Sequence, residues 1–254
     1  MPSRLPVQML WIGPRLSAME RLSIASFLAN GHAVQLYTYG DVEGIPPGVE
    51  HHDGREVLPA GSVFTYAEGF GKGSYAGFAN LFRYKLLLDH GGVWCDTDVV
   101  CLKPFDFDAR PYVIGRERKP FDPEKGQTER LAIGVLKVPP NSRVMLECYA
   151  ISMEANKAAL RWGETGPELA TKRFVRHGLE VHALPPAAFY PVDWWDTEDL
   201  VTKPIAFGPE SYAVHLWNEV WRHKGLDKDA DYPADCAYET LKRRYSVGSG
   251  TIRR

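Results

Sequence analysis

The sequence predicts an α/β fold, with a mixed but mostly parallel central sheet flanked by helices. Residues 7–13 read as a buried strand, residues 17–31 as a helix and residues 32–40 as an alternating strand. Strand, helix and strand in succession indicate a βαβ unit, which builds a parallel sheet through a right-handed crossover. A second helical stretch at 74–90 leads directly into another apolar run, which extends the alternation.

The first helix carries sequence signals at both of its ends. Ser17 is placed as the N-cap, Glu20 follows at the spacing of a capping box, and Gly31 marks the C-terminal end. Residues 40–72 are rich in Gly, Pro and His and lack periodicity, so we expect a loop with short irregular elements. The next helix stops at a pair of glycines, Gly91 and Gly92.

The second half of the chain continues with strands and helices. We expect strands at 111–115, 131–138, 181–185, 189–192 and 212–217, and helices at 142–160 and 165–178. Thr165 and Glu168 have the spacing of a second capping box, and Gly178 follows the last turn. Because no repeat, low-complexity tract or linker interrupts the chain, we predict a single domain over residues 1–254. Residues 248–254 are expected to form a frayed tail.

Composition limits the classes of function. The chain has 254 residues, a net charge of −2 and 44% hydrophobic residues, so it offers no bulk positive charge for nucleic acid. Its four cysteines form no Cys-x-x-Cys pair, which favours a reduced, cytoplasmic protein. The first apolar run is too short to span a membrane and lacks a signal-peptide pattern, although peripheral membrane association stays open.

Two aspartates, Asp96 and Asp98, interrupt the apolar stretch "GGVWCDTDVV". On a strand they would point to the same side, and two buried like charges are costly unless a cation lies between them. Paired carboxylates suit Mg²⁺ or Mn²⁺, so we predict a metal site. The alternative is a strand end where both carboxylates reach water or cap a helix. The same spacing recurs in polar or Pro-flanked segments, where solvated carboxylates cost little, at Asp106/Asp108, Asp227/Asp229 and Asp229/Asp231.

Further candidate residues lie on both sides of this pair. Asn80 and Arg83 share one helix face, and Arg83 could bind a phosphate or sugar hydroxyl, an ordinary ion pair being the alternative. His215 lies in "HLWNEVWR", where an imidazole is either a metal ligand or a packed core residue. Trp217 belongs to the same segment, and Lys224 follows in a stretch that could fold over a phosphate.

One enzyme class that uses such an aspartate pair is the haloacid-dehalogenase-type phosphotransferase. There, one aspartate is phosphorylated and the second acts as acid and base. Such enzymes usually carry the motif on their first strand and need an acidic pair downstream, commonly within Gly-Asp-x-x-x-Asp. The Gly-Asp of this chain, Gly40-Asp41, lies upstream, so this reading is kept only as an alternative.

The stretch "FANLFRYKLLLDHGGVWCDTDVVCLKPFD" closely resembles the signature of the DXD sugar transferases, glycosyltransferase family 32 and its relatives. The shared pattern is a helix with an arginine, a glycine pair, an aromatic residue, Asp-x-Asp and then Lys-Pro. The resemblance continues in "LWIG", "ETGPELAT" and "HLWNEVWR", and so extends over nearly the whole chain. The family includes α-1,4-galactosyltransferases and bacterial capsule or lipopolysaccharide enzymes.

The resemblance implies a GT-A fold, a Rossmann-like type of α/β fold that binds a nucleoside-diphosphate sugar. It implies a Mn²⁺- or Mg²⁺-dependent hexosyltransferase that retains configuration, prefers a UDP-sugar over a GDP-sugar, and uses a glycan or glycolipid acceptor. Residues 1–105 would be the half that binds the nucleotide sugar, and residues 106–254 the acceptor-side half. A carbohydrate-binding relative without catalysis is a second alternative.

The resemblance also assigns roles to individual residues. Asp96, Asp98 and Arg83 would be catalytic. The metal would be bound by Asp96, Asp98 and His215. The nucleotide-sugar donor would be contacted by Trp11 and Gly13 near the base and ribose, and by Asn80, Arg83, Asp96 and Trp217 near the sugar or phosphates. Lys224 is added as a donor contact from its position in the chain and not from the resemblance.

Overall fold

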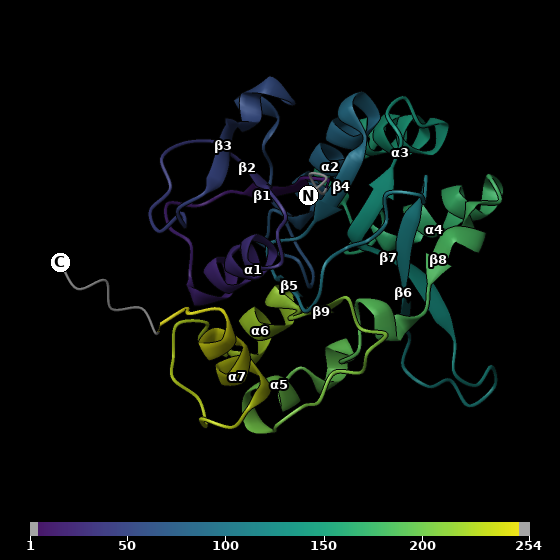
Figure 1. Ribbon diagram of the computed structural model, residues 1–254. Helices are drawn as coiled ribbons and strands as arrows, with labels where there is room; N and C mark the ends of the chain where they lie inside the picture. The colour runs from purple at the N-terminus through teal and green to yellow at the C-terminus, as the bar shows by residue number, and fades with distance from the viewer. Residues whose placement is uncertain (1–4, 249–254) are drawn as a thin grey trace.

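The computed structural model describes residues 5–248, whose centre is a seven-stranded sheet flanked by helices (Figure 1). The strand order is β3-β2-β1-β4-β7-β6-β8, and β7 alone of these strands runs against the others. The expected α/β class with a mixed, mostly parallel sheet is therefore confirmed. The sheet strands are β1 (Val7–Trp11), β2 (Val34–Thr38), β3 (Val49–Asp53), β4 (Gly92–Cys95), β6 (Val113–Arg118), β7 (Glu129–Val138) and β8 (Ala183–Leu184). The expected frayed tail lies outside the described residues from position 249 onward.

The N-terminal βαβ unit forms as predicted. β1 pairs in parallel with β2, and α1 (Ala18–Ala29) connects them. Ser17 caps α1 by accepting from the Met19 amide at 3.3 Å, while Glu20 accepts from the Ser17 amide at 2.7 Å. Gly31 follows the helix with a positive φ of 80°, a conformation that favours glycine. Both predicted end signals of this helix are confirmed.

The expectation of an irregular segment at 40–72 is only partly right. Two short 3₁₀ helices occur there, Gly54–Glu56 and Ala60–Ser62, but β3 pairs in parallel with β2 and forms an edge of the sheet. The sequence of β3, VEHHD, is mostly polar. Polar side chains are common on edge strands, so the alternation that identifies an ordinary half-buried strand is absent here.

The predicted strand through both aspartates is wrong. β4 ends at Cys95, residues 96–98 form a turn, and β5 (Val99–Cys101) enters a separate two-stranded sheet with β9 (Ala213–His215). The turn is fixed at its start, where the Asp96 amide donates to the Gly134 carbonyl at 2.8 Å. Asp96 and Asp98 therefore lie in the turn between β4 and β5, and the alternation of side chains along a strand does not determine their directions.

Three expectations in the second half also need correction. The second capping box does not form: α4 (Pro167–Arg176) has Gly166 at its N-cap position without a side-chain cap. The expected helix at 142–160 ends early, since α3 spans Arg143–Glu154. The expected strand at 189–192 is irregular chain after a 3₁₀ turn, Pro186–Ala188.

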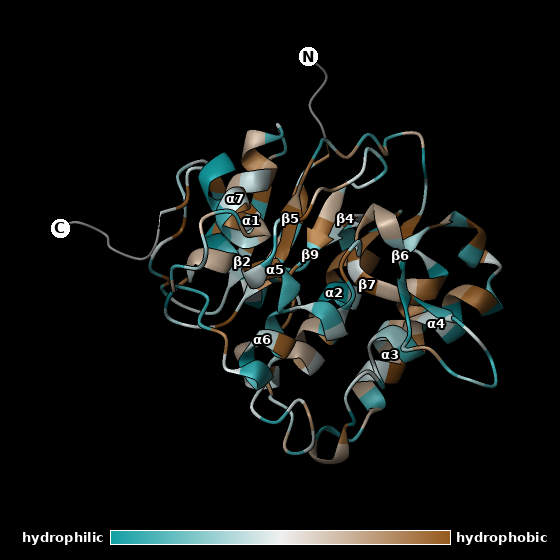
Figure 2. Ribbon diagram, turned by 90° about the horizontal axis from the view of Figure 1, so that it is seen from below, coloured by the Kyte–Doolittle hydropathy of each residue, from teal (hydrophilic) through white to brown (hydrophobic). Residues whose placement is uncertain are grey.

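Helices cover both faces of the sheet. α2 (Ala76–His90), α3 and α4 pack on one face around buried residues such as Phe82 and Trp94. α1 and the small β5-β9 sheet cover the other face. α7 (Ala237–Arg244) packs beside α1, and α5 (Asp199–Thr202) and α6 (Asn218–Lys224) lie next to α7 (Figure 1). Figure 2 shows the apolar strands enclosed between more polar outer helices. None of the described helices is long and apolar enough to cross a membrane.

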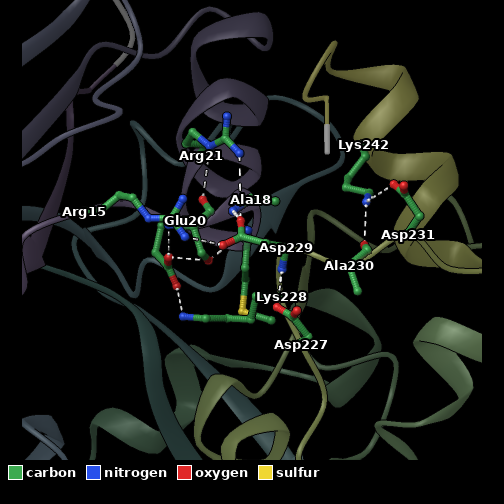
Figure 3. A network of polar contacts seen from close by, with 12 residues as sticks. Arg15, Ala18, Glu20, Arg21, Asp227, Lys228, Asp229, Ala230, Asp231 and Lys242 are labelled. Atoms are coloured by element: carbon green, nitrogen blue, oxygen red, sulfur yellow. Dashed lines mark hydrogen bonds and ion pairs between the residues drawn. The ribbon is translucent and has the colours of Figure 1, made fainter. Parts of the chain in front are cut away.

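A polar network joins the segment after α6 to the start of α1 (Figure 3). Asp229 accepts from the Ala18 amide at 2.8 Å and forms an ion pair with Arg15 at 2.6 Å. The neighbouring Lys228 lies 2.6 Å from Glu20, a carboxylate that is 1% exposed. The Asp229 carboxylate is therefore a structural anchor rather than the solvated group expected from sequence. Its negative charge also lies at the helix N-terminus, where the helix dipole favours it.

Asp229→Ala is expected to lower the free energy of unfolding by about 1–2 kcal/mol, because an α1 amide loses its partner and Arg15 loses its ion pair. Asp231→Ala is the matched control in the same segment, since its side chain is 76% exposed and its nearest cation, Lys242, is 4.0 Å away. Urea denaturation of both variants checks the prediction. Equal losses would show that the Asp229 contacts do not stabilise the fold.

Candidate metal centre

The two turn carboxylates converge with one imidazole at the junction of the two sheets. One ligand atom each from Asp96, Asp98 and His215 lies within 4.8 Å of the others. β9 delivers the histidine, because His215 pairs with Val99 directly after the turn. Asp98 accepts from the Asn218 amide at 2.8 Å, and its other oxygen lies 3.1 Å from His215 Nε2. Tertiary structure thus brings together residues that are more than a hundred positions apart.

Arg83 on α2 holds the Asp96 carboxylate from the other side. Its guanidinium pairs with Asp96, donates to Asn80 Oδ1 at 2.9 Å and lies 4.8 Å from the ring centre of Trp94. The Trp94 indole also donates to Asp96, at 2.8 Å. Arg83 is 2% exposed, so this ion pair is largely buried. The sequence prediction that Asn80 and Arg83 share a face beside the aspartates is confirmed.

The two carboxylates differ electrostatically. Burial raises the pKa of Asp96, which Arg83 opposes and the nearby Asp98 reinforces. Burial acts on Asp98 in the same direction, but His215 and the Asn218 amide outweigh it and lower the pKa of Asp98. Burial opposes the charged form of His215, yet the neighbouring aspartates raise its pKa on balance. Asp98 is therefore the carboxylate that favours its charged, ligating form more strongly.

The donor set suits a divalent cation. Two carboxylate oxygens and one imidazole nitrogen are typical ligands of Mn²⁺ and also acceptable to Mg²⁺. The remaining ring nitrogen, His215 Nδ1, is buried and has no hydrogen-bond partner among residues 5–248. The second oxygen of the Asp96 carboxylate, Oδ2, lies near Gly134, on the side where His215 Nε2 also lies. These residues fit the predicted metal, with Asp96, Asp98 and His215 as the ligands.

Two residues of the site were missed by the sequence analysis, Gly134 and Tyr190. A Cβ at Gly134 would lie 3.1 Å from Tyr190 Oη, 3.2 Å from Asp96 Oδ2 and 3.7 Å from His215 Nε2. The Tyr190 ring packs edge-on against His215, with 5.5 Å between ring centres, and its hydroxyl accepts from the Val135 amide at 3.2 Å. A glycine inside a buried strand signals close approach and could have pointed to Gly134.

Gly134→Ala is expected to weaken Mn²⁺ binding about tenfold, because the added methyl crowds Asp96 Oδ2 and disturbs the ligand geometry. The fold should persist, since alanine has no backbone penalty in a strand. Calorimetric titration of Mn²⁺ measures the effect. Gly61→Ala is the control, because a Cβ there has nothing within 4 Å. Wild-type affinity in both variants would show that the space beside Gly134 does not matter for the site.

The remaining predicted donor contacts lie at different distances from this cluster. Trp217 touches it directly, with its ring centre 4.1 Å from that of His215, and adopts a left-handed φ of 61°, a strained conformation for a bulky residue. Trp11 and Gly13 lie at the end of β1, where Gly13 lines a small cavity with the end of β2. Lys224, in contrast, is engaged by Glu198 at 2.6 Å. Within the described part of the chain, Trp11, Gly13 and Lys224 make no contact with the two aspartates. Their roles in binding the nucleotide sugar stay predictions.

Two family models match the chain in the regions that build the site. Residues 64–118 match the glycosyltransferase sugar-binding region containing the DXD motif. Residues 152–246 match the conserved region of the α-1,4-glycosyltransferases. The first region carries Arg83, Asp96 and Asp98, and the second carries His215 and Trp217. Both models describe glycosyltransferases.

Curated relatives agree with these matches. The chain is 29% identical to the lactosylceramide 4-α-galactosyltransferase of Rattus norvegicus over 153 residues, covering 54% of this chain and 39% of the rat protein. The Homo sapiens protein of the same name is 28% identical over 153 residues, covering 54% and 40%. The chain therefore spans about two fifths of the length of these relatives.

Two glycosyltransferases are among the solved structures with some similarity to the chain. The PaToxG glycosyltransferase aligns over 98% of this chain and 88% of its own, with a TM-score of 0.49 and 15% identity. The apo-form glycosyltransferase GlyE of Streptococcus pneumoniae aligns over 99% and 66%, with a TM-score of 0.41 and 10% identity.

Proposed function

We propose that this chain, a member of the DXD-containing glycosyltransferases, transfers a sugar from a nucleoside-diphosphate sugar to a glycan or glycolipid acceptor. The observation that carries the proposal is the Asp96-Asp98-His215 cluster, because its ligands come from both family-matched regions. Mn²⁺ or Mg²⁺ is the proposed cofactor, and a UDP-sugar is preferred over a GDP-sugar.

The chemistry requires stabilisation of the negative charge on the departing diphosphate. A bound divalent cation supplies such charge as a Lewis acid. Asp98 and His215 hold it, and Arg83 orients Asp96 as the second carboxylate. Both terminal nitrogens of Arg83 are occupied, one by Asp96 and one by Asn80. We therefore propose that its main role is to position Asp96, and that direct contact with a phosphate is secondary. We propose retention of configuration, in line with the α-1,4 family match.

The base and ribose are proposed to bind beyond the C-terminal ends of β1 and β2. In open α/β sheets, ligands bind outside the carboxyl ends of the strands, at the point where the strand order reverses. In this sheet that point is at β1, because β2 lies on one side of it and β4 on the other. Gly13 lines a cavity there with Tyr39 and Asp41. The Trp11 indole nitrogen is buried and lacks a partner among the described residues, which leaves a donor for the ligand.

The rat relative is named for transfer of galactose to lactosylceramide. We therefore propose UDP-galactose and lactosides as the first substrates to test. We also propose a cytoplasmic location, with peripheral association at the inner membrane face if the acceptor is a glycolipid. The four cysteines, all free and buried, support a reducing compartment.

A thermal-shift panel tests the proposal. UDP- and GDP-sugars are added with and without Mn²⁺ or Mg²⁺, and a ligand at a hundredfold its dissociation constant adds about 2.7 kcal/mol to the free energy of unfolding. For a chain of this size, the unfolding temperature should rise by about 5–10 °C with nucleotide and metal together. Released nucleotide is then measured with lactose as acceptor. If no nucleotide sugar shifts unfolding while glycans alone do, the chain is a carbohydrate-binding relative.

A further inference from the structure

A partly exposed cluster of aromatic rings lies on chain segments that adjoin the candidate metal centre. Its members are Tyr66, Phe70, Trp162 and His223, which we name the aromatic cluster. The Phe70 ring stacks on His223 with 3.9 Å between centres, and Trp162 lies 5.2 Å from Phe70 and 5.3 Å from Tyr66. Phe70 and Trp162 are 42% and 37% exposed, although the cluster rests on the buried Tyr66. Exposed apolar patches mark binding sites for a ligand, a partner protein or a membrane.

The cluster is held in place by its surroundings. Phe70 lies on the glycine-rich segment 69–73, and Gly71 brings this segment so close that a Cβ there would lie 2.6 Å from Trp162. Two residues of α6 fix the same segment: Arg222 donates to the Lys72 carbonyl at 3.1 Å, and His223 contacts the Phe70 carbonyl. Rings fixed before a ligand arrives bind it with less loss of conformational entropy.

Three chain segments link the cluster to the metal centre over short distances. On α2, Gly77 packs on Tyr66 and Asn80 lies one turn further along the same face. On α6, His223 follows Asn218, whose amide binds Asp98, by five residues, or about 7.5 Å of helix rise. The third segment runs from Trp162 to Gly166, where a Cβ would lie 3.0 Å from Asn80 Nδ2.

We propose that the aromatic cluster binds the acceptor saccharide and directs its terminal sugar to the metal centre. This inference depends on the proposed function. The apolar C–H face of a hexose packs on an aromatic ring, while its hydroxyl groups need polar partners at the rim. Arg161, Glu164 and Lys72 supply such groups beside the rings. A saccharide is favoured because α2, α6 and residues 162–166 connect the rings to the proposed site for sugar transfer.

Trp162→Ala and Phe70→Ala test the proposal on a glycan array, with the full chain, UDP and Mn²⁺ present. Wild type should bind a subset of oligosaccharides, and each variant should lose that binding at least about tenfold. Phe121→Ala is the matched control, because Phe121 is 69% exposed on the β6–β7 connection, which carries none of the cluster residues. Mn²⁺-dependent UDP binding, measured by calorimetry, should be the same in all four proteins.

The two proposals can fail separately. Absence of UDP binding in wild type would remove the proposed function. Two results would overturn the acceptor site alone, each with normal UDP binding. In the first, both cluster variants bind glycans as well as wild type does. In the second, wild type binds no glycan. Light scattering and phosphatidylglycerol vesicle binding are measured in parallel. If Trp162→Ala converts a dimer to a monomer or releases the chain from vesicles, without changing glycan binding, the cluster serves that contact and the proposal is overturned.

Discussion

Asp98→Asn is expected to reduce sugar transfer and Mn²⁺-dependent nucleotide binding by at least about a hundredfold, while the chain still folds. The substitution keeps the size of the side chain but removes the negative charge that we propose ligates the metal. Asparagine retains one oxygen that can accept from the Asn218 amide, now at 2.8 Å from Asp98. The ion pair with His215 is lost, so a modest fall in stability accompanies the larger functional loss.

Asp108→Asn is the matched control for this experiment. Asp108 belongs to another Asp-x-Asp pair of the chain, and its side chain is exposed. UDP titration with and without Mn²⁺ measures binding, and circular dichroism verifies the fold. If Asp98→Asn binds UDP and Mn²⁺ like wild type, Asp98 is not a metal ligand and the proposed mechanism is wrong.

Arg83→Met should cause the largest loss of stability among the site variants, about 3 kcal/mol of unfolding free energy. Methionine fills a similar volume but leaves the Asp96 carboxylate without its cation and Asn80 without a donor. Since a chain of this size loses about 2–4 °C per kcal/mol, the unfolding temperature should fall by about 6–12 °C. Mn²⁺ should restore part of this loss, because the ion replaces the missing positive charge beside Asp96.

Two further variants make this prediction specific. Arg55→Met removes an exposed arginine, 69% accessible and paired with Asp53, and should leave the unfolding temperature almost unchanged. Arg83→Lys keeps the charge but not the planar fork that reaches Asp96 and Asn80 together, so it should preserve more stability than activity. An Arg83→Met chain that unfolds at the wild-type temperature would contradict the buried ion pair. If Mn²⁺ raises the unfolding temperature of Arg83→Met by no more than that of wild type, the ion does not replace the missing positive charge beside Asp96.

The sequence by itself determined the α/β class, the N-terminal βαβ unit and most residues of the candidate metal centre. These depend on local chemistry: apolar periodicity, helix caps, and charged residues in an apolar stretch that need compensation. The motif around Arg83, Asp96 and Asp98 lies within a short stretch of chain, so its pattern is visible without folding. The prediction placed both aspartates on one strand, yet the three residues that it proposed as ligands do meet in the structure.

Tertiary structure alone decided how the site is assembled. The pairing of β5 with β9 brings His215 to Asp98, and no local pattern encodes a contact between residues 117 positions apart. Tyr190 and Gly134 join the centre for the same reason, since their neighbours come from other parts of the chain. The polar β3 forms a strand only because β2 offers it backbone partners. Local preferences select the elements, whereas long-range packing and hydrogen bonding select the neighbours of each side chain.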